Sequence, residues 1–465
     1  MEAGRLQNKC FKIFTRKSIQ FFGLLALFLI LSSCITANAE EEAVCFFDGI
    51  CYTEDAQFFS EGGRLIWFDY ETGTMMPLCM RPECKHSWNH ERAYASFEDL
   101  LMDQEECFSL RSARAEGPFL VHGNQVYLVE CGSDVFEEKH HLTLWESSVD
   151  GVGKQIAALG DEFSWDILPT CSSAVLKGNE LFLAVHLQEN PYITLSSESE
   201  SAEAFEESIL YSVDLTTGSF REILRLHNRH CSLSLLQMCG DVLYYSWSST
   251  YEYTPSVSLD EIVFDDSDSS VEQLDLYYSE MEGATVAGIQ GIHVNTGEVV
   301  NLDPQLSAAD AKASRQGLAY GISGHSLWFF MNPSISGSEE TGKSECKMID
   351  LMDGSILGTW EAPLIDFYEG FSPYYQLDET RFLCYLFYPR GEYSVYDLST
   401  GEFTVLPLHN DYSAGEGETA YDMNAEPIQT EYIFMNTGNG GRSFYLTRSM
   451  ILEGFYEPVQ AETLD

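Results

Sequence analysis

The chain has 465 residues, of which 73 are Asp or Glu and 25 are Lys or Arg, so its formal net charge is −48. Binding to phosphate groups requires clustered Lys and Arg, and this balance excludes nucleic acids and anionic lipid headgroups as partners. Hydrophobic residues make up 45% and aromatic residues 13% of the chain. That composition is enough for a large core and favours a β-rich protein.

The first residues have the pattern of an export signal. The basic residues Arg5, Lys9, Lys12, Arg16 and Lys17 precede an apolar run, FFGLLALFLIL, at 21–31. The run is shorter than the roughly 20 residues that a membrane-spanning helix needs. A basic start before a short apolar run is typical of a secretory signal peptide. We therefore predict a signal peptide over 1–33 and an exported protein.

The segment after the apolar run, Leu31-Ser32-Ser33-Cys34, resembles the lipobox of bacterial lipoproteins. The resemblance implies that Cys34 receives a diacylglycerol and becomes the first residue of the mature chain. An acidic tether over 34–42 would then hold the protein at the outer face of the membrane. Ala37-Asn38-Ala39 offers the alternative, because cleavage at an A-x-A site releases a secreted, soluble protein.

An unusual group of thiols and imidazoles follows the first predicted strands. Cys79, Cys84 and His86 lie within eight residues. Thiolate and imidazole are ligands that Zn²⁺ prefers, and a structural site needs four, so His90 or Cys107 would complete it. The spacing is not that of a standard zinc finger. Three interpretations stay open: a structural Zn²⁺ site at Cys79, Cys84 and His86, a disulfide between Cys79 and Cys84, or thiols that only pack.

One unit recurs along the chain, an alternating apolar strand that ends in a tight turn, usually with Asp four residues before Gly. Glycine supplies the positive φ that such turns demand. The six copies end at Gly73, Gly151, Gly218, Gly297, Gly354 and Gly401. A second hairpin precedes most copies, and its turn contains Gly123, Gly178, Gly240 or Gly324.

Two hairpins per unit make a four-stranded sheet, and such sheets repeated around an axis form a β-propeller. A further unit over 425–456 has strand-like segments but lacks a Thr-Gly turn after the last of them. The sequence therefore predicts an all-β fold, a propeller of seven four-stranded blades over 43–457, followed by a disordered tail over 458–465. A β-sandwich, or two smaller β domains, is the alternative.

Insertions explain the longer spacings between the turns. The acidic stretch 196–208 is predicted to be a loop. The insertion 254–283 carries a charge run at 265–268, interpreted as solvated because the fixed Gly and closing Glu of a calcium loop are missing. The aromatic residues Tyr244, Tyr245, Trp247, Tyr251 and Tyr253 are expected to fill the gap between blades, with stacking on sugar rings or contact with a protein partner as the alternative. Most cysteines are expected to be buried.

The lipobox, the propeller repeats and the Cys79–His86 segment together resemble a group of uncharacterised surface lipoproteins of Gram-positive anaerobes. Their propeller is remotely similar to that of the low-density lipoprotein receptor. Those relatives often carry a further Cys shortly after the His, where this chain has Glu91. The resemblance implies a surface location and a propeller, and no known reaction.

Enzyme signatures are missing from the sequence, which has no G-x-S-x-G elbow, no H-E-x-x-H motif and no Walker loop. We therefore predict no catalytic residue. The predicted function is that of a membrane-anchored, monomeric lipoprotein whose propeller loops bind a protein, peptide or glycan. The alternative is an extracytoplasmic carbohydrate-active hydrolase or lyase, which should bring acids or a His pair together at the central opening.

Overall fold

Antiparallel β-strands form the folded part of the chain in the computed structural model. The structure describes residues 43–61, 64–78, 117–134, 139–148, 154–164, 167–189, 206–227, 229–250, 256, 273, 276–277, 280, 285–303, 318–332, 343–365, 370–386, 391–409, 420–423, 426–437 and 444–463. They lie in one compact unit, Ala43–Asp465. Within these ranges, no helix is both long and apolar enough to cross a membrane.

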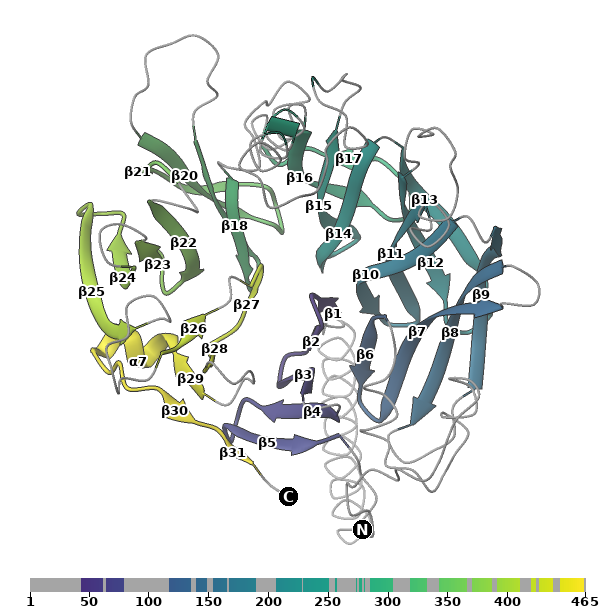
Figure 1. Cartoon of the computed structure of the whole chain (residues 1–465), viewed down its shortest axis with the longest axis horizontal. Helices are drawn as coiled ribbons and strands as arrows, with labels where there is room; N and C mark the ends of the chain where they lie inside the picture. The colour runs from purple at the N-terminus through teal and green to yellow at the C-terminus, as the bar shows by residue number, and fades with distance from the viewer. Residues whose placement is uncertain are drawn as a thin grey trace, which may run out of the picture. The chain divides into compact units, whose positions relative to one another are not determined.

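Most sheets are meanders of four strands that follow one another along the chain, as predicted (Figure 1). The first such sheet comprises β6 (Phe119–His122), β7 (Gln125–Asp134), β8 (Lys139–Ser148) and β9 (Lys154–Ser164). Another comprises β14 (Arg229–Cys239), β15 (Val242–Thr250), β16 (Thr285–His293) and β17 (Val299–Val300). A third comprises β22 (Phe371–Gln376), β23 (Arg381–Leu386), β24 (Glu392–Asp397) and β25 (Glu402–His409).

Two further sheets depart slightly from this pattern. The strands β18 (Leu318–Ser323), β19 (Ser326–Met331), β20 (Lys343–Asp350) and β21 (Ile356–Pro363) gain a fifth, β27 (Ile428–Gln429), which pairs in parallel with β18. The last sheet comprises β26 (Asp422–Met423), β28 (Tyr432–Asn436), β29 (Phe444–Thr447) and β30 (Val459–Gln460), with a short helix, α7 (Arg448–Glu453), between β29 and β30.

The remaining strands form one ten-stranded sheet in which two meanders are joined by β1 (Val44–Phe47). One meander comprises β2 (Ile50–Tyr52), β3 (Ala56–Glu61), β4 (Arg64–Asp69) and β5 (Thr74–Pro77), and the other comprises β10 (Ile167–Lys177), β11 (Glu180–Glu189), β12 (Glu206–Asp214) and β13 (Phe220–His227). The strand β31 (Glu462–Thr463) adds to the outer edge of β5.

The repeated turn has a simple chemical basis. The carboxylate of Asp214 accepts a hydrogen bond from the backbone N–H of Thr216 at 2.8 Å, and the same contact recurs at Asp69, Asp350 and Asp397. This side-chain turn positions the chain so that the residue four positions on must take positive φ. Gly218 has φ of 69° and donates its N–H to the Asp214 carbonyl. The predicted glycine turns are confirmed at 73, 218, 297, 354 and 401, and the copy at Gly151 lies outside the described residues.

Turns of neighbouring sheets lie at a common end of the molecule. Lys177 Nζ donates to the carbonyl of Gly240 at 2.9 Å, and Arg221 donates to the carbonyl of Val294 at 3.0 Å. Each contact joins a tight turn of one sheet to the corresponding turn of the next. We call this end of the sheets the turn end, and the opposite end the loop end.

Successive strands of a meander reverse direction. The connections between second and third strands, and those that lead to the next sheet, therefore start and finish at strand ends on the loop end. Five of these connections are long, at 78–118, 190–205, 251–284, 301–317 and 410–421. At the turn end, most connections are two to five residues. The last sheet is the exception, since its turn-end connections contain β27 and α7.

Apolar clusters lie between successive sheets and connect the last sheet to the first. Phe434 of β28 packs edge-on against Phe68 of β4 at 4.8 Å between ring centroids. At the centre, β1 pairs with both β10 and β2, and β27 pairs with β18 (Figure 1). The all-β propeller fold is thus confirmed, and its inner strands are bridged by two short central strands.

Most of the aromatic and cysteine side chains expected in the interior are buried in the described ranges. Tyr244 and Tyr245 are buried, as expected for residues between blades, Trp247 is half-buried, and Tyr251 and Tyr253 lie outside the described residues. Seven of the cysteines in the described ranges are buried and Cys131 is half-buried. The disordered tail predicted over 458–465 is wrong for residues 458–463, which contain β30 and β31. Ala461 between these strands is buried in the cluster that joins the last and first sheets, and this burial holds the segment in place.

Candidate functional site

The residues singled out from the sequence lie outside the described ranges. They are Cys34, the proposed Zn²⁺ ligands Cys79, Cys84 and His86, and the candidate fourth ligands His90 and Cys107. Leu78, directly before this segment, is buried against the core shared by the first sheets. In the part of the chain that the structure describes, no group of three or more His, Cys, Asp or Glu side chains could hold a metal ion.

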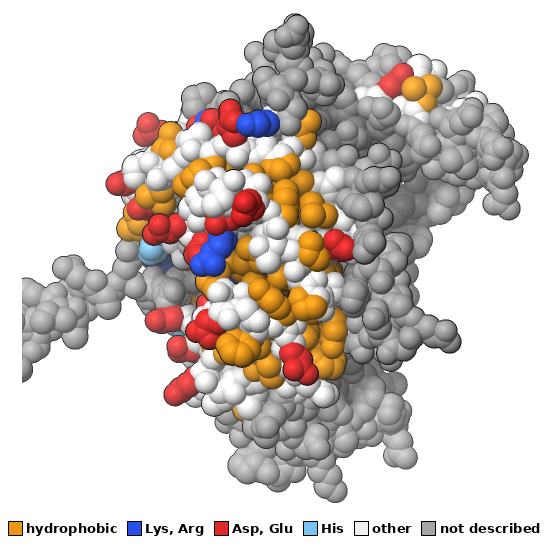
Figure 2. Space-filling model, turned by 90° about the vertical axis from the view of Figure 1, so that its left-hand side faces the viewer, with side chains coloured by type: hydrophobic (Ala, Val, Ile, Leu, Met, Phe, Trp, Pro, Cys, Tyr) orange, Lys and Arg blue, Asp and Glu red, His pale blue; other side chains and the backbone are white. Residues whose placement is uncertain are grey.

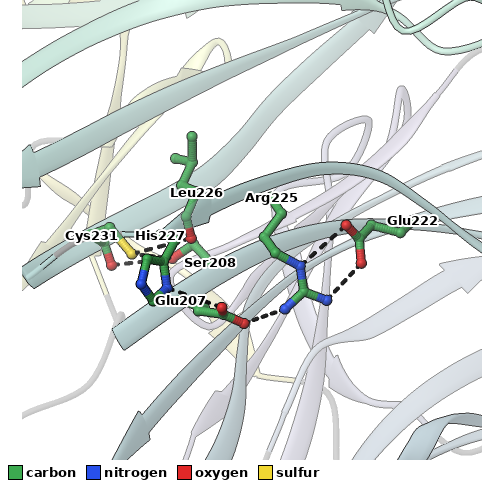
Figure 3. A network of polar contacts seen from close by, with 7 residues as sticks. All are labelled: Glu207, Ser208, Glu222, Arg225, Leu226, His227 and Cys231. Carbon is green, nitrogen blue, oxygen red and sulfur yellow. Dashed lines mark hydrogen bonds and ion pairs between the residues drawn. The ribbon is translucent and has the colours of Figure 1, made fainter. Parts of the chain in front are cut away.

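A polar network at the loop end is the strongest candidate site among the described residues (Figure 3). It is built where β12 begins, β13 ends and β14 begins, beside the long connection 190–205. Antiparallel pairing places Glu207 opposite His227 and Ser208 opposite Leu226. Cross-strand neighbours of this kind have side chains close enough to interact.

The outer half of the network is a chain of ion pairs. The guanidinium of Arg225 donates to both oxygens of Glu222, at 3.2 and 2.6 Å, and also to Glu207. The second oxygen of Glu207 lies 3.0 Å from Nδ1 of His227. The side chain of Glu207 is 13% exposed, whereas that of His227 is 66% exposed. Glu207 is therefore the inner anchor, and the imidazole is presented to solvent.

The electrostatics of this half follow from the same contacts. Hydrogen bonds from Arg225 hold the pKa of the Glu222 carboxyl below its usual range. The hydrogen bond to Glu222 is also the main reason that the pKa of the Arg225 guanidinium is raised. Two carboxylates around one guanidinium leave a net negative charge when His227 is neutral, which suits a cationic or hydrogen-bond-donating group on a ligand.

The inner half of the network joins four strands through the buried Ser208 and Cys231 and the half-buried His186 and Leu226. Ser208, which is 1% exposed, donates its hydroxyl to the carbonyl of Cys231 at 3.1 Å. Nδ1 of His186 lies 3.1 Å from the same hydroxyl oxygen. The thiol of Cys231 lies 3.7 Å from the carbonyl oxygen of Leu226.

A serine and a histidine at this distance are a possible nucleophile and base in hydrolases. Here the hydroxyl proton of Ser208 is donated to a backbone carbonyl, and the side chain is buried away from any substrate. His186 then acts as donor to the Ser208 oxygen. The contact therefore orders β11, β12 and β14 and supports the exposed ion pairs.

Sequence reasoning missed this network because it placed Glu207 and Ser208 in the acidic loop 196–208. The structure shows that Glu206–Asp214 is a strand, so the interpretation is wrong for 206–208. Acidic residues at 203, 206 and 207 made the loop and strand look continuous. The partners that stabilise the strand, on β11 and β13, are not visible in a local window.

The similarity of the chain to known proteins is distant. No family model and no curated protein matches the chain. Among solved structures, the chain is similar to the β-propeller domain of the Trilobed protease from Pyrococcus furiosus, with 10% identity over 76% of this chain and 87% of that one and a TM-score of 0.35. The acylaminoacyl peptidase of Pyrococcus horikoshii shares 13% identity over 74% of this chain, with a TM-score of 0.36. TolB from Acinetobacter baumannii shares 13% over 89% of this chain and 79% of that one, with a TM-score of 0.25.

This chain covers only 45% of the acylaminoacyl peptidase. At these identities, the similarity is one of fold alone, and it assigns no ligand or reaction to this chain.

Proposed function

We propose that this protein is an extracytoplasmic lipoprotein, anchored through a diacylglycerol on Cys34, whose propeller binds a protein, peptide or glycan at the loop end. We further infer that it is a monomer with seven blades. Counting β2–β5 and β10–β13 as separate blades within the ten-stranded sheet, together with the five other sheets, supports the number seven.

The observation that carries the proposal is the difference between the two ends. The strand ends that border the long connections of several sheets lie at the loop end, and long connections on a rigid scaffold are where binding residues concentrate. The network of Glu207, Arg225 and His227 lies at the same end and offers partly exposed charged groups. At the turn end, each repeated aspartate uses a carboxylate oxygen to accept a backbone hydrogen bond within its own turn.

The proposed anchor and the Cys79 segment can be tested by one experiment. Native mass spectrometry of the protein extracted from its own membrane should show the diacylglycerol on a chain that begins at Cys34. A mature chain that begins at Glu40 would instead support secretion. The same spectrum distinguishes a structural Zn²⁺ bound through Cys79, Cys84 and His86 from a disulfide, which lowers the mass by two hydrogens, and from unmodified thiols.

Binding at the loop end is tested with a matched pair of arginine variants. Arg225 and Arg381 have similarly exposed side chains, 39% and 38%, and each pairs with an acid three residues away. Arg225 lies in the loop-end network, whereas Arg381 is the first residue of β23, next to the turn that follows β22. We expect Arg225→Gln to change binding to a glycan array or to a poly-lysine peptide at least threefold, and Arg381→Gln to leave it unchanged.

Poly-glutamate serves as the negative probe, because like charges should repel it. Equal binding by both variants and the parent would argue against the loop end as the binding site. If the parent protein cleaves a glycan on the array, the proposed binding function is wrong and the protein is a carbohydrate-active enzyme.

A further inference from the structure

The chain enters the propeller at the turn end. Val44 pairs with Leu176, one residue from the end of β10, while Phe47 pairs with Ser173, further into that strand. The strand β1 therefore runs from the turn end toward the loop end. On its other side, Cys45 pairs with Tyr52, beside the turn between β2 and β3. Because β1 is hydrogen-bonded on both edges, the entry point at Ala43 is fixed at the turn end.

Exposed apolar side chains gather at this same end. All the large hydrophobic residues that are exposed in the described ranges, apart from Leu276 and Leu364, lie in a connection between third and fourth strands or within the first four residues of a fourth strand. They are Phe220, Val299, Met352, Ile356, Leu357, Phe403, Val405, Phe455 and Val459. We call this set the turn-end rim. Figure 2 shows the outer side of the molecule that carries β21 and β25, where hydrophobic side chains are interspersed with acidic and other polar ones.

We propose that the turn end faces the lipid bilayer, with the turn-end rim against its surface and the loop end directed away. This inference rests on the proposed lipid anchor at Cys34. The proposed partner of the turn-end rim is the membrane that holds that lipid, and not a second copy of the chain or a separate protein.

The length of the tether supports this orientation. Nine residues, 34–42, precede Ala43, and a fully extended chain spans at most about 3.5 Å per residue, or about 30 Å in all. The strand β10 has 11 residues and rises about 3.3 Å per residue, so the sheet is about 35 Å high there. At β10, a tether that starts at the turn end is therefore too short to bring the loop end to the bilayer while Cys34 stays in it.

The charge of the turn end sets the conditions for contact. The aspartates of the turns lie at the surface. Hydrogen bonds from the backbone of Thr216 and Thr217 lower the pKa of Asp214, and hydrogen bonds from the side chain and the backbone of Ser355 lower that of Asp353. They stay ionised at neutral pH and repel anionic headgroups, in keeping with the overall charge of the chain. The contact is therefore apolar, stronger on zwitterionic lipid, and favoured by salt on anionic lipid because salt screens the repulsion.

Tryptophan fluorescence can measure the orientation. The full-length lipidated protein is reconstituted into phosphatidylcholine vesicles, with and without brominated phosphatidylcholine, which quenches nearby indoles. Two variants, each with one added tryptophan, are compared with the parent. The fluorescence of the parent's seven tryptophans is subtracted as background. Ile356→Trp is at the turn end of β21, and Leu364→Trp, the matched control, lies just beyond the loop end of the same strand.

We expect brominated lipid to quench at least a third of the fluorescence added by Ile356→Trp and none of that added by Leu364→Trp. Quenching of both equally, or of Leu364→Trp alone, would overturn the orientation. In vesicles with phosphatidylglycerol, added NaCl should increase the quenching, and a decrease would contradict the apolar contact.

Two controls separate this inference from the anchor on which it rests. Flotation with the vesicles and the mass of the same sample report the lipid on Cys34, and Cys34→Ala should remove both. An unlipidated parent that does not float would reject the anchor. A lipidated parent with the reverse quenching pattern would reject the orientation alone. If either tryptophan variant fails to fold, hydrogen exchange of the parent replaces it, with 350–357 expected to be protected by vesicles and 362–364 not.

Discussion

A single buried amide connects three parts of the ring, and its removal should be costly. Oε1 of Gln429, in the central strand β27, accepts hydrogen bonds from Nε1 of Trp328 at 3.0 Å and from the backbone N–H of Gln376 at 2.9 Å. Its Nε2 donates to the carbonyl of Tyr374 at 3.0 Å. Gln429 is 5% exposed and Trp328 is fully buried. In Gln429→Leu, the two donors lose their acceptor in a place that water does not reach.

The size of the effect follows from those two donors. A buried polar group left without a partner costs about 1–3 kcal/mol, so two cost about 2–6 kcal/mol, and the apolar Leu side chain recovers about 1 kcal/mol. We therefore expect Gln429→Leu to lower the free energy of unfolding by about 3 kcal/mol, measured by urea unfolding with tryptophan fluorescence. The same substitution at the exposed Gln155 of β9 is the control and should change it by less than about 0.5 kcal/mol. Equal effects at the two sites would refute the reasoning.

Three further predictions concern other contacts. Lys347→Met removes an ion pair with Asp303, whose side chain is 6% exposed and lies 3.2 Å from Nζ. It should destabilise the protein by about 3 kcal/mol in the same urea assay. An effect below about 1 kcal/mol would show that water or another group near Asp303 replaces the lysine. Gly354 has φ of 72° and open space around it, so Gly354→Ala should lower the free energy of unfolding by about 1 kcal/mol. Gly218→Ala places Cβ 2.5 Å from a backbone oxygen and should lower it by about 3 kcal/mol. Thermal unfolding should show the larger loss for Gly218→Ala. Burial raises the pKa of Tyr375 to about 12 from an ordinary value near 10, so its contribution to stability is complete below pH 10 and is lost as pH rises toward 12; an alkaline titration followed by tyrosinate absorbance should show this phenol ionising only with unfolding.

The propeller could be predicted because its turns are encoded locally. The side chain of Asp397 accepts the N–H of Ser399, and Gly401 takes the positive φ that follows. All three residues lie within five positions of sequence, so the pattern is visible without any knowledge of the fold. The alternating apolar strands on either side are local signals of the same kind.

The central strands and the loop-end network could not be predicted because their partners are distant in sequence. Gln429 contacts Trp328 across 101 positions, and the short strand around it has no alternating pattern to mark it. Ser208 and Cys231 lie on different sheets, and only the packing of β12 against β14 brings them together. The tail was mispredicted for the same reason, since Ala461 is held by a cluster formed mainly from the first sheet.

The two ends of the propeller therefore differ in how their polar groups are used. At the turn end, an aspartate such as Asp350 is committed to the N–H of Met352, and that turn is needed whether or not a ligand is present. A ligand that competed for the carboxylate would loosen the hairpin. At the loop end, Glu207 and Arg225 hold each other in place without holding a turn, so their outer atoms can take a ligand at no cost to the sheet. This division is consistent with the proposed anchor at the turn end and the proposed binding surface at the loop end.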